Sequence, residues 1–130
     1  MKRVFISFRA EDRKQVDGLR LLAANPQFDI EFYDESLRTA IDSQNEAYIR
    51  KQIRERINRT SITLCLMSEY TYSSSWVSWE LRESIDKGNA IILMGLPGGP
   101  QQLQLPAPVT GSTWWLWDVN KLHSLIQAAP

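Results

Sequence analysis

A single carboxylate between aromatic side chains is the feature of this sequence best suited to chemistry. Trp76 and Glu80 lie four residues apart in the segment 73–81, so they share one face of a helix, while Val77 and Leu81 face the sheet. The start of a helix favours the charge on Glu80, whereas aromatic burial disfavours it. Such a carboxylate can stabilise the positive sugar that develops as a glycosidic bond breaks. The alternative is a surface glutamate on an amphipathic helix.

Other familiar sites lack essential parts. The glycines at 95–99 have neither the Lys-Ser/Thr pair nor the helix start of a P-loop. A response-regulator receiver needs an acidic pair after the first strand and an acceptor aspartate after the third. These places hold Ser7-Phe8-Arg9 and Met67-Ser68-Glu69. A flavin phosphate loop is also missing after Phe8.

The remaining nucleophile and ligand types are isolated in the sequence. His123 is the only histidine, and we expect it to be a solvated residue of the closing helix. Cys65 is the only cysteine, which excludes an internal disulfide and a cysteine-based zinc site. Because it lies between two leucines, it is predicted to pack as a small hydrophobe. We expect no metal site.

Strands and helices alternate along the chain and must position these residues. Strand-like runs are predicted at 2–8, 28–33, 61–67, 89–95 and 113–117. Helices are predicted from Val16 to Asn25-Pro26 and over 46–59, 75–87 and 118–127, with long loops at 34–45 and 97–110. This alternation predicts one α/β domain over residues 1–130, with a flavodoxin-like, three-layer fold and a five-stranded parallel sheet of order 2-1-3-4-5.

Ligands of such folds bind at the carboxyl ends of the strands. We therefore expect one edge of the sheet to be lined by Ser7, Phe8, Arg9, Ser68, Glu69 and the 34–45 loop, which opens with Asp34. The loop is longer than an ordinary connection, and this excess favours a functional segment.

Local signals predict how several helices and one aromatic strand pack. Serines 73–75 offer N-caps and Lys87-Gly88 a C-cap for one helix. The 46–59 helix carries isoleucines on one side and a basic face, which we expect to be solvated. In 113–117, strand alternation would send Trp115 and Trp117 one way and Trp114 the other, packed at the edge of the sheet.

Composition narrows the range of partners. The chain has 130 residues, with 15 Lys plus Arg and 15 Asp plus Glu. This balance favours neither a nucleic-acid nor a membrane partner. The sequence shows no signal-peptide pattern and no apolar run near the roughly 18 residues of a membrane span. A cytoplasmic, soluble domain is the expectation.

Two boxes of this sequence resemble those of Toll/interleukin-1 receptor (TIR) domains. The opening Lys-Arg-Val-Phe-Ile-Ser-Phe-Arg-Ala-Glu-Asp is similar to their first-strand box, and Ser75-Trp76-Val77-Ser78-Trp79-Glu80-Leu81 is similar to their Ser-x-Trp-x-x-x-Glu-Leu box. The segments 58–63 and 83–89 are similar to the bacterial TIR-like branch found in Thoeris antiphage defence. The resemblance covers roughly residues 2–96 and is weak from Pro97 onward.

The resemblance implies an enzyme that takes NAD as its substrate, needs no separate cofactor and cleaves the bond between nicotinamide and ribose. Its ADP-ribose product, free or cyclised, would be a second messenger for a separate effector, after a phage-derived trigger. Glu80 matches the catalytic glutamate and Trp76 its supporting aromatic. Ser7 and Phe8 match the strand end that lines the nucleotide pocket, and Arg9, Asp34 and Ser68 are expected to bind substrate beside them. The 34–45 loop matches the loop that completes a neighbour's site in TIR assemblies, which implies a homo-oligomer.

Two other functions remain open from the sequence. The chain could be a non-catalytic TIR-like scaffold that signals by self-association through its basic helix and tryptophan-rich strand. It could also resemble a nucleoside deoxyribosyltransferase, which uses a glutamate against an N-glycosidic bond and leaves NAD intact.

Overall fold

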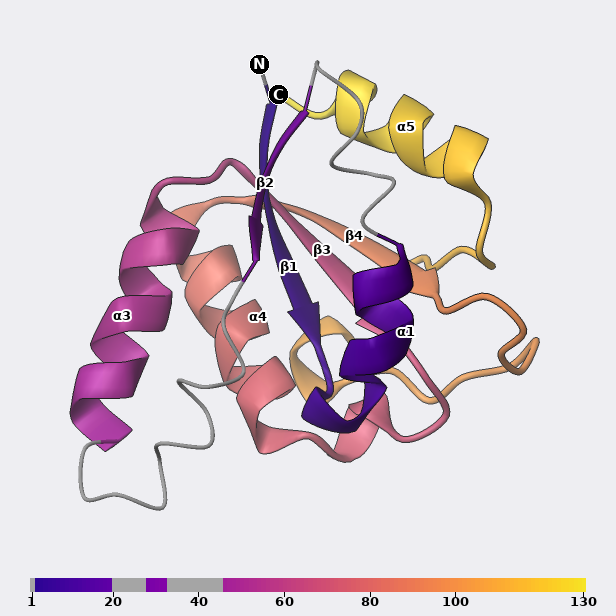
Figure 1. Ribbon diagram of the computed structural model, residues 1–130, viewed down its shortest axis with the longest axis horizontal. Helices are drawn as coiled ribbons and strands as arrows, with labels where there is room; N and C mark the ends of the chain where they lie inside the picture. Colours follow the sequence, from indigo (N-terminus) through magenta and orange to yellow (C-terminus); the bar gives the residue numbers. More distant parts are fainter. Residues whose placement is uncertain (1, 20–27, 33–45) are drawn as a thin grey trace.

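A computed structural model describes residues 2–19, 28–32 and 46–130 of the chain (Figure 1). The strands are β1 (Lys2–Phe8), β2 (Phe28–Phe32), β3 (Ile62–Met67) and β4 (Ala90–Gly95). The helices are α1 (Arg13–Gly18), α3 (Glu46–Asn58), α4 (Ser75–Lys87) and α5 (Val119–Ala128), with short 3-10 turns η1 (Ala10–Asp12), η4 (Thr71–Ser73) and η5 (Ala107–Val109). None of the helices described is long and apolar enough to cross a bilayer.

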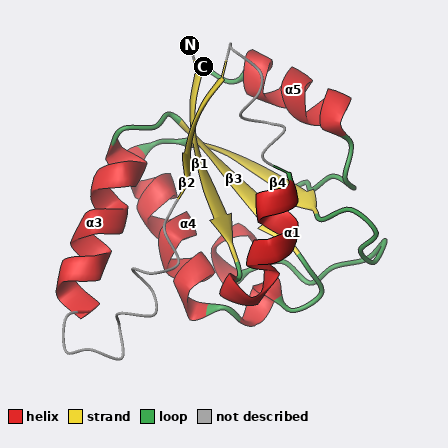
Figure 2. Ribbon diagram, in the orientation of Figure 1, coloured by secondary structure: helices red, strands yellow, loops and turns green. Residues whose placement is uncertain are grey.

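The four strands form one parallel sheet in the order β2-β1-β3-β4. Helices α3 and α4 lie on one side of the sheet and α1 and α5 on the other (Figures 1 and 2). The predicted α/β class and parallel sheet are therefore confirmed, and the observed strands follow the first four positions of the predicted order. The first helix begins at Arg13, earlier than the predicted Val16, and ends at Gly18. The rest of the predicted helix, from residue 20 to Asn25-Pro26, and the 34–45 loop lie outside the described residues.

The predicted fifth strand over 113–117 is wrong. In residues 46–130 this segment contributes one isolated parallel bridge, between Trp115 and Met94. Gly111 turns the chain just before it with a φ of 83°, and Asp118 caps α5 just after it, so there is little length for a ladder. The predicted alternation also fails, because Trp117 packs into the core while Trp115 is 36% exposed.

The predicted helix signals are confirmed at α3 and α4. On α3, Ile49, Ile53 and Ile57 are buried at four-residue spacing. The Ser74 hydroxyl accepts a hydrogen bond of 3.2 Å from the N–H of Val77, which fixes the start of α4. Gly88 ends the helix with a φ of 92°, a left-handed conformation that favours glycine.

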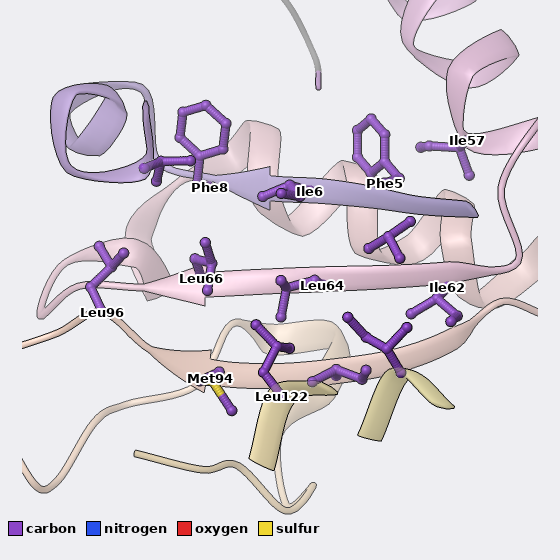
Figure 3. Close-up of a cluster of buried hydrophobic side chains, with 14 of the residues drawn as sticks. Phe5, Ile6, Phe8, Ile57, Ile62, Leu64, Leu66, Met94, Leu96 and Leu122 are labelled. Atoms are coloured by element: carbon purple, nitrogen blue, oxygen red, sulfur yellow. The ribbon is translucent and has the colours of Figure 1, made fainter. Parts of the chain in front are cut away.

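The buried side chains form two clusters, and the larger one includes side chains on both faces of the sheet (Figure 1). One cluster joins β1, β3 and β4 to α1, α3 and α5; Figure 3 shows Phe8, Leu66, Met94 and Leu122 among its members. A second cluster lies under α4 and contains Cys65, Met67, Val77, Leu81, Leu93 and Val109. β3 is buried along its whole length, as expected of a central parallel strand.

Candidate active site

Glu80 lies in the buried side of α4, with none of its surface exposed. It shares this side with Val77, Leu81 and Ser84. The interpretation of Glu80 as a surface residue is therefore wrong, and so is the expected split between a face holding Trp76 with Glu80 and a separate face toward the sheet. Trp76 is only partly buried, whereas Glu80 points into the molecule.

Ser7 meets this carboxylate from the end of β1. Its hydroxyl donates a hydrogen bond of 2.8 Å to Glu80 Oε1, and Ser7 is itself fully buried. Because neighbouring residues of a strand point to opposite faces, Ser7 faces α4 while Phe8 faces away from it. The side chain of Phe8 packs into the first core cluster and is 2% exposed. The structure thus brings Ser7 and Glu80 together and separates Phe8 from them.

Glu80 is buried, and the thiol of Cys65 lies close enough for the charge of Glu80 to affect its pKa. Ser7 is paired in register with Cys65 on β3. Burial, and to a lesser degree the charge of Glu80, raise the pKa of the Cys65 thiol. Cys65 therefore stays a protonated thiol near neutral pH, which fits the expected small hydrophobe better than a nucleophile. A buried charge is costly unless it is hydrogen-bonded, and the Ser7 hydroxyl supplies such a bond.

A chain of buried hydrogen bonds anchors α4 to the sheet next to Glu80. The Ser84 hydroxyl donates to the backbone carbonyl of Glu80 at 2.8 Å and accepts from the Thr63 hydroxyl at 2.7 Å. The Asn89 amide nitrogen donates to Thr63 at 3.2 Å and to Thr60 at 3.1 Å. Lys87 Nζ binds the carbonyls of Ile57 and Thr60 and the side-chain oxygen of Asn89. This network fixes the height of α4 above β3.

The opposite stripe of α4 packs on α3 through aromatic and basic side chains. The rings of Trp76 and Trp79 meet edge to face, with centroids 5.7 Å apart. The Arg50 guanidinium lies over both rings, 5.2 Å and 5.0 Å from their centroids. Arg54 lies over Trp79 and forms two hydrogen bonds of 3.1 Å with Glu83. Two residues of the predicted solvated basic face are thus part of the contact between α3 and α4.

Two further predicted site residues, Arg9 and Ser68, follow β1 and β3 at the carboxyl ends of these strands. The Arg9 side chain pairs with Glu11 at 2.6 Å and lies over the Tyr70 ring at 5.4 Å. The Ser68 hydroxyl donates to Asp12 Oδ2 at 2.6 Å. Asp34 lies outside the described residues. Within 2–19, 28–32 and 46–130, no three His, Cys, Asp or Glu side chains are grouped so that they could hold a metal ion.

A pocket of about 240 Å³ opens beyond the end of β4. It is lined by Leu96, Pro97, Gly98, Gly99, Gln101, Leu116 and Trp117. Neither Ser7 nor Glu80 contributes to this lining. The predicted catalytic residue Glu80 and its partner Ser7 therefore lie outside this pocket.

Sequence reasoning missed four residues that hold the candidate site in place, namely Arg50, Thr63, Ser84 and Asn89. A signal existed for Ser84, because it lies four residues after Glu80 and thus on the same side of the helix. Thr63 and Asn89 lie in the segments 58–63 and 83–89 that carry the family resemblance, but their hydrogen bonds join separate elements of the fold and were not predicted.

Comparison with known proteins places the chain in a family. The family model described as "Thoeris protein ThsB, TIR-like domain" matches residues 5–101. A relative from Bacillus cereus (strain MSX-D12), named "Putative cyclic ADP-D-ribose synthase ThsB1", is 32% identical over 95 residues, or 70% of this chain and 50% of that protein. The chain thus spans about half the length of this relative.

Solved structures show the same fold at lower identity. The TIR domain of the Toll-related receptor TRR-2 from Hydra magnipapillata aligns with a TM-score of 0.59 and 18% identity, over 95% of this chain and 90% of that one. The CMP N-glycosidase BcmB from Clostridium botulinum aligns with a TM-score of 0.58 and 15% identity, over 97% and 96%. At these identities the likeness concerns the fold alone.

Proposed function

The chain belongs to the TIR-like family of the Thoeris protein ThsB, and from this premise we propose that it cleaves the nicotinamide–ribose bond of NAD and makes an ADP-ribose-derived second messenger. The observation that carries the proposal is the buried Glu80 carboxylate, hydrogen-bonded by Ser7 where β1 ends. The name of the Bacillus cereus relative supports a cyclic ADP-ribose product.

The proposed reaction needs one well-placed negative charge more than it needs an acid. The bond from the ribose anomeric carbon to the nicotinamide nitrogen breaks, and its electron pair leaves with the ring, which becomes neutral nicotinamide. Positive charge develops on the ribose, and Glu80 stabilises it. Water or a nucleophile of the ADP-ribose itself then bonds to the anomeric carbon and loses its proton. The identity of that nucleophile decides between a free and a cyclic product.

The roles we propose for the other residues follow from where they lie. Trp76 supports the substrate from the start of α4, and Arg9, Ser68 and Asp34 contribute from the carboxyl edge of the sheet. Phe8 is not given a substrate contact, because its side chain packs on the other face of the sheet.

The proposed partners complete the signalling scheme. A second copy of the chain would complete the site through the 34–45 segment, a phage-derived component would trigger the reaction, and a separate effector would respond to the nucleotide. If neighbouring copies complete the site, specific activity rises with protein concentration.

The test is mass spectrometry of NAD incubated with the protein, with and without lysate of infected cells. We expect Glu80→Gln to lower product formation by roughly 100-fold or more, because it removes the charge and keeps the shape. Asp86→Asn is the matched control, since Asp86 is an exposed carboxylate of the same helix. Equal turnover in the Glu80 variant would refute the assignment of Glu80. Intact NAD under all conditions would refute the activity, and consumption of deoxynucleosides would favour the transferase alternative.

A further inference from the structure

Ser7 is a polar residue in the buried part of β1, where the other side chains are apolar. It lies between Ile6 and Phe8 in a strand whose residues from Val4 onward are all buried. A buried hydroxyl is costly without a partner, so its placement requires a specific hydrogen bond. The structure provides that bond across the interior, from Ser7 Oγ to Glu80 Oε1.

The hydroxyl of Ser7 has no further proton to donate to a substrate. A serine hydroxyl has one proton to donate, and here that proton is directed to Glu80. Its position is fixed by the backbone, because Ser7 is paired with Cys65 on β3 and the residues of β1 before it are also paired with β2. A donor held rigidly by a central strand restricts the rotamer of the carboxylate that it contacts.

We infer that Ser7 is a positioning residue for Glu80: its hydroxyl holds the carboxylate in one orientation and favours its charged form. This inference rests on the proposed function, in which that charge stabilises the developing positive ribose. It replaces the expected direct contact of Ser7 with substrate by an action through Glu80.

Within residues 2–19, 28–32 and 46–130, few titratable groups face Glu80 from the elements packed on α4. β3 presents the Cys65 thiol, and β4 and η5 contain no titratable side chain. The lysine and arginine of β1 lie at its other end, and η4 contributes the partly exposed Tyr72. On α3, Arg50 and Arg54 contact the indoles and Glu83. Because the Cys65 thiol interacts with the charge of Glu80, Cys65→Ala shows whether a change in the titration of Glu80 comes from Ser7 alone.

The experiment compares Ser7→Ala with Ser7→Thr, which retains a hydroxyl, and with Ser78→Ala, which removes a buried serine of α4. We expect Ser7→Ala to lower kcat about tenfold with little change in KM, since a positioning role acts on the transition state. The acid limb of the pH profile of kcat/KM should move to higher pH, because the charged form of Glu80 has lost a hydrogen-bond donor. Ser7→Thr should retain the original limb, and Ser78→Ala should leave the profile unchanged.

A second readout does not depend on turnover. In protein labelled with ¹³C at the glutamate carboxyls, the Glu80 signal is the one absent from Glu80→Gln. Its titration midpoint should move to higher pH in Ser7→Ala, and should do so equally in a Cys65→Ala background. An unchanged midpoint and an unchanged acid limb would overturn the inference. If Glu80→Gln retains full activity, the catalytic assignment of Glu80 fails, while the carboxyl titration still decides whether Ser7 holds Glu80.

Discussion

Thr63 offers a direct measure of how strongly α4 is anchored to the sheet. Thr63→Val replaces the hydroxyl by a methyl of nearly the same volume, so packing is preserved while two hydrogen bonds are lost. One is the 2.7 Å bond to Ser84, and the other is the 3.2 Å bond from the Asn89 amide. The Asn89 amide nitrogen keeps only its bond to Thr60. A buried donor left without an acceptor costs roughly 1–3 kcal/mol, so we expect the free energy of unfolding to fall by about 2 kcal/mol.

Urea denaturation measures this change, with the slope of the transition unaltered if the variant remains two-state. At this chain length the melting temperature should fall by roughly 6–10 °C. Thr63→Ser is the matched control, because it keeps the hydroxyl and loses only a methyl. The double variant Thr63→Val with Ser84→Ala should lose less stability than the two single variants do together, because both substitutions remove the same hydrogen bond between Thr63 and Ser84. A loss below about 0.5 kcal/mol in Thr63→Val would refute the reasoning.

Three further changes test other parts of the structure by urea denaturation. Arg50→Ala removes two ring contacts and the exposed ion pair with Glu46, and it should lower the free energy of unfolding by about 1–2 kcal/mol. Lys51→Ala, on the exposed side of the same helix, should change the free energy of unfolding by less than about 0.5 kcal/mol. Equal effects of the two substitutions would contradict the stacking argument. Phe8→Ala should cost about 3–5 kcal/mol as a core truncation, and a loss below about 1 kcal/mol would contradict its burial. Burial raises the pKa of Cys65 in the folded state above its ordinary value of 9.0, so the unfolded chain loses this proton first and stability falls as pH rises above 9. Cys65→Ala should lack that part of the slope, about 1.4 kcal/mol per pH unit, and an identical slope in both proteins would show that the thiol does not titrate differently on folding.

The sequence predicted those parts of the fold that depend on local patterns. Apolar runs marked β1, β3 and β4, and serine and glycine caps marked both ends of α4. The segment 113–117 shows the limit of such patterns. Its tryptophans have strong strand propensity, yet a glycine turn and a helix cap within a few residues leave room for one bridge only.

The sequence predicted that Glu80 lies on a helix beside Trp76, but it did not predict that Glu80 is buried. On a helix with about 100° between residues, Glu80 lies roughly 60° from Val77, at the margin of the apolar side. Such a marginal position is exposed or buried according to what lies opposite it. Here Ser7 lies opposite, from a strand 73 positions earlier in the chain. Burial of Glu80 is therefore a property of the tertiary structure, which the spacing within 73–81 does not contain.

The single bridge at Trp115 also determines how the free edge of the sheet is protected. Trp115 donates to the carbonyl of Leu93 at 2.9 Å and accepts from the N–H of Gly95 at 2.8 Å, while the Lys121 ammonium lies 4.0 Å from its ring centroid. Beneath it runs β4, with the uncharged sequence Ala-Ile-Ile-Leu-Met-Gly. Segments of this kind pair readily with other chains when their edge is uncovered. Detachment of residue 115 would therefore expose the Leu93 carbonyl and the Gly95 N–H at this edge to pairing with another chain.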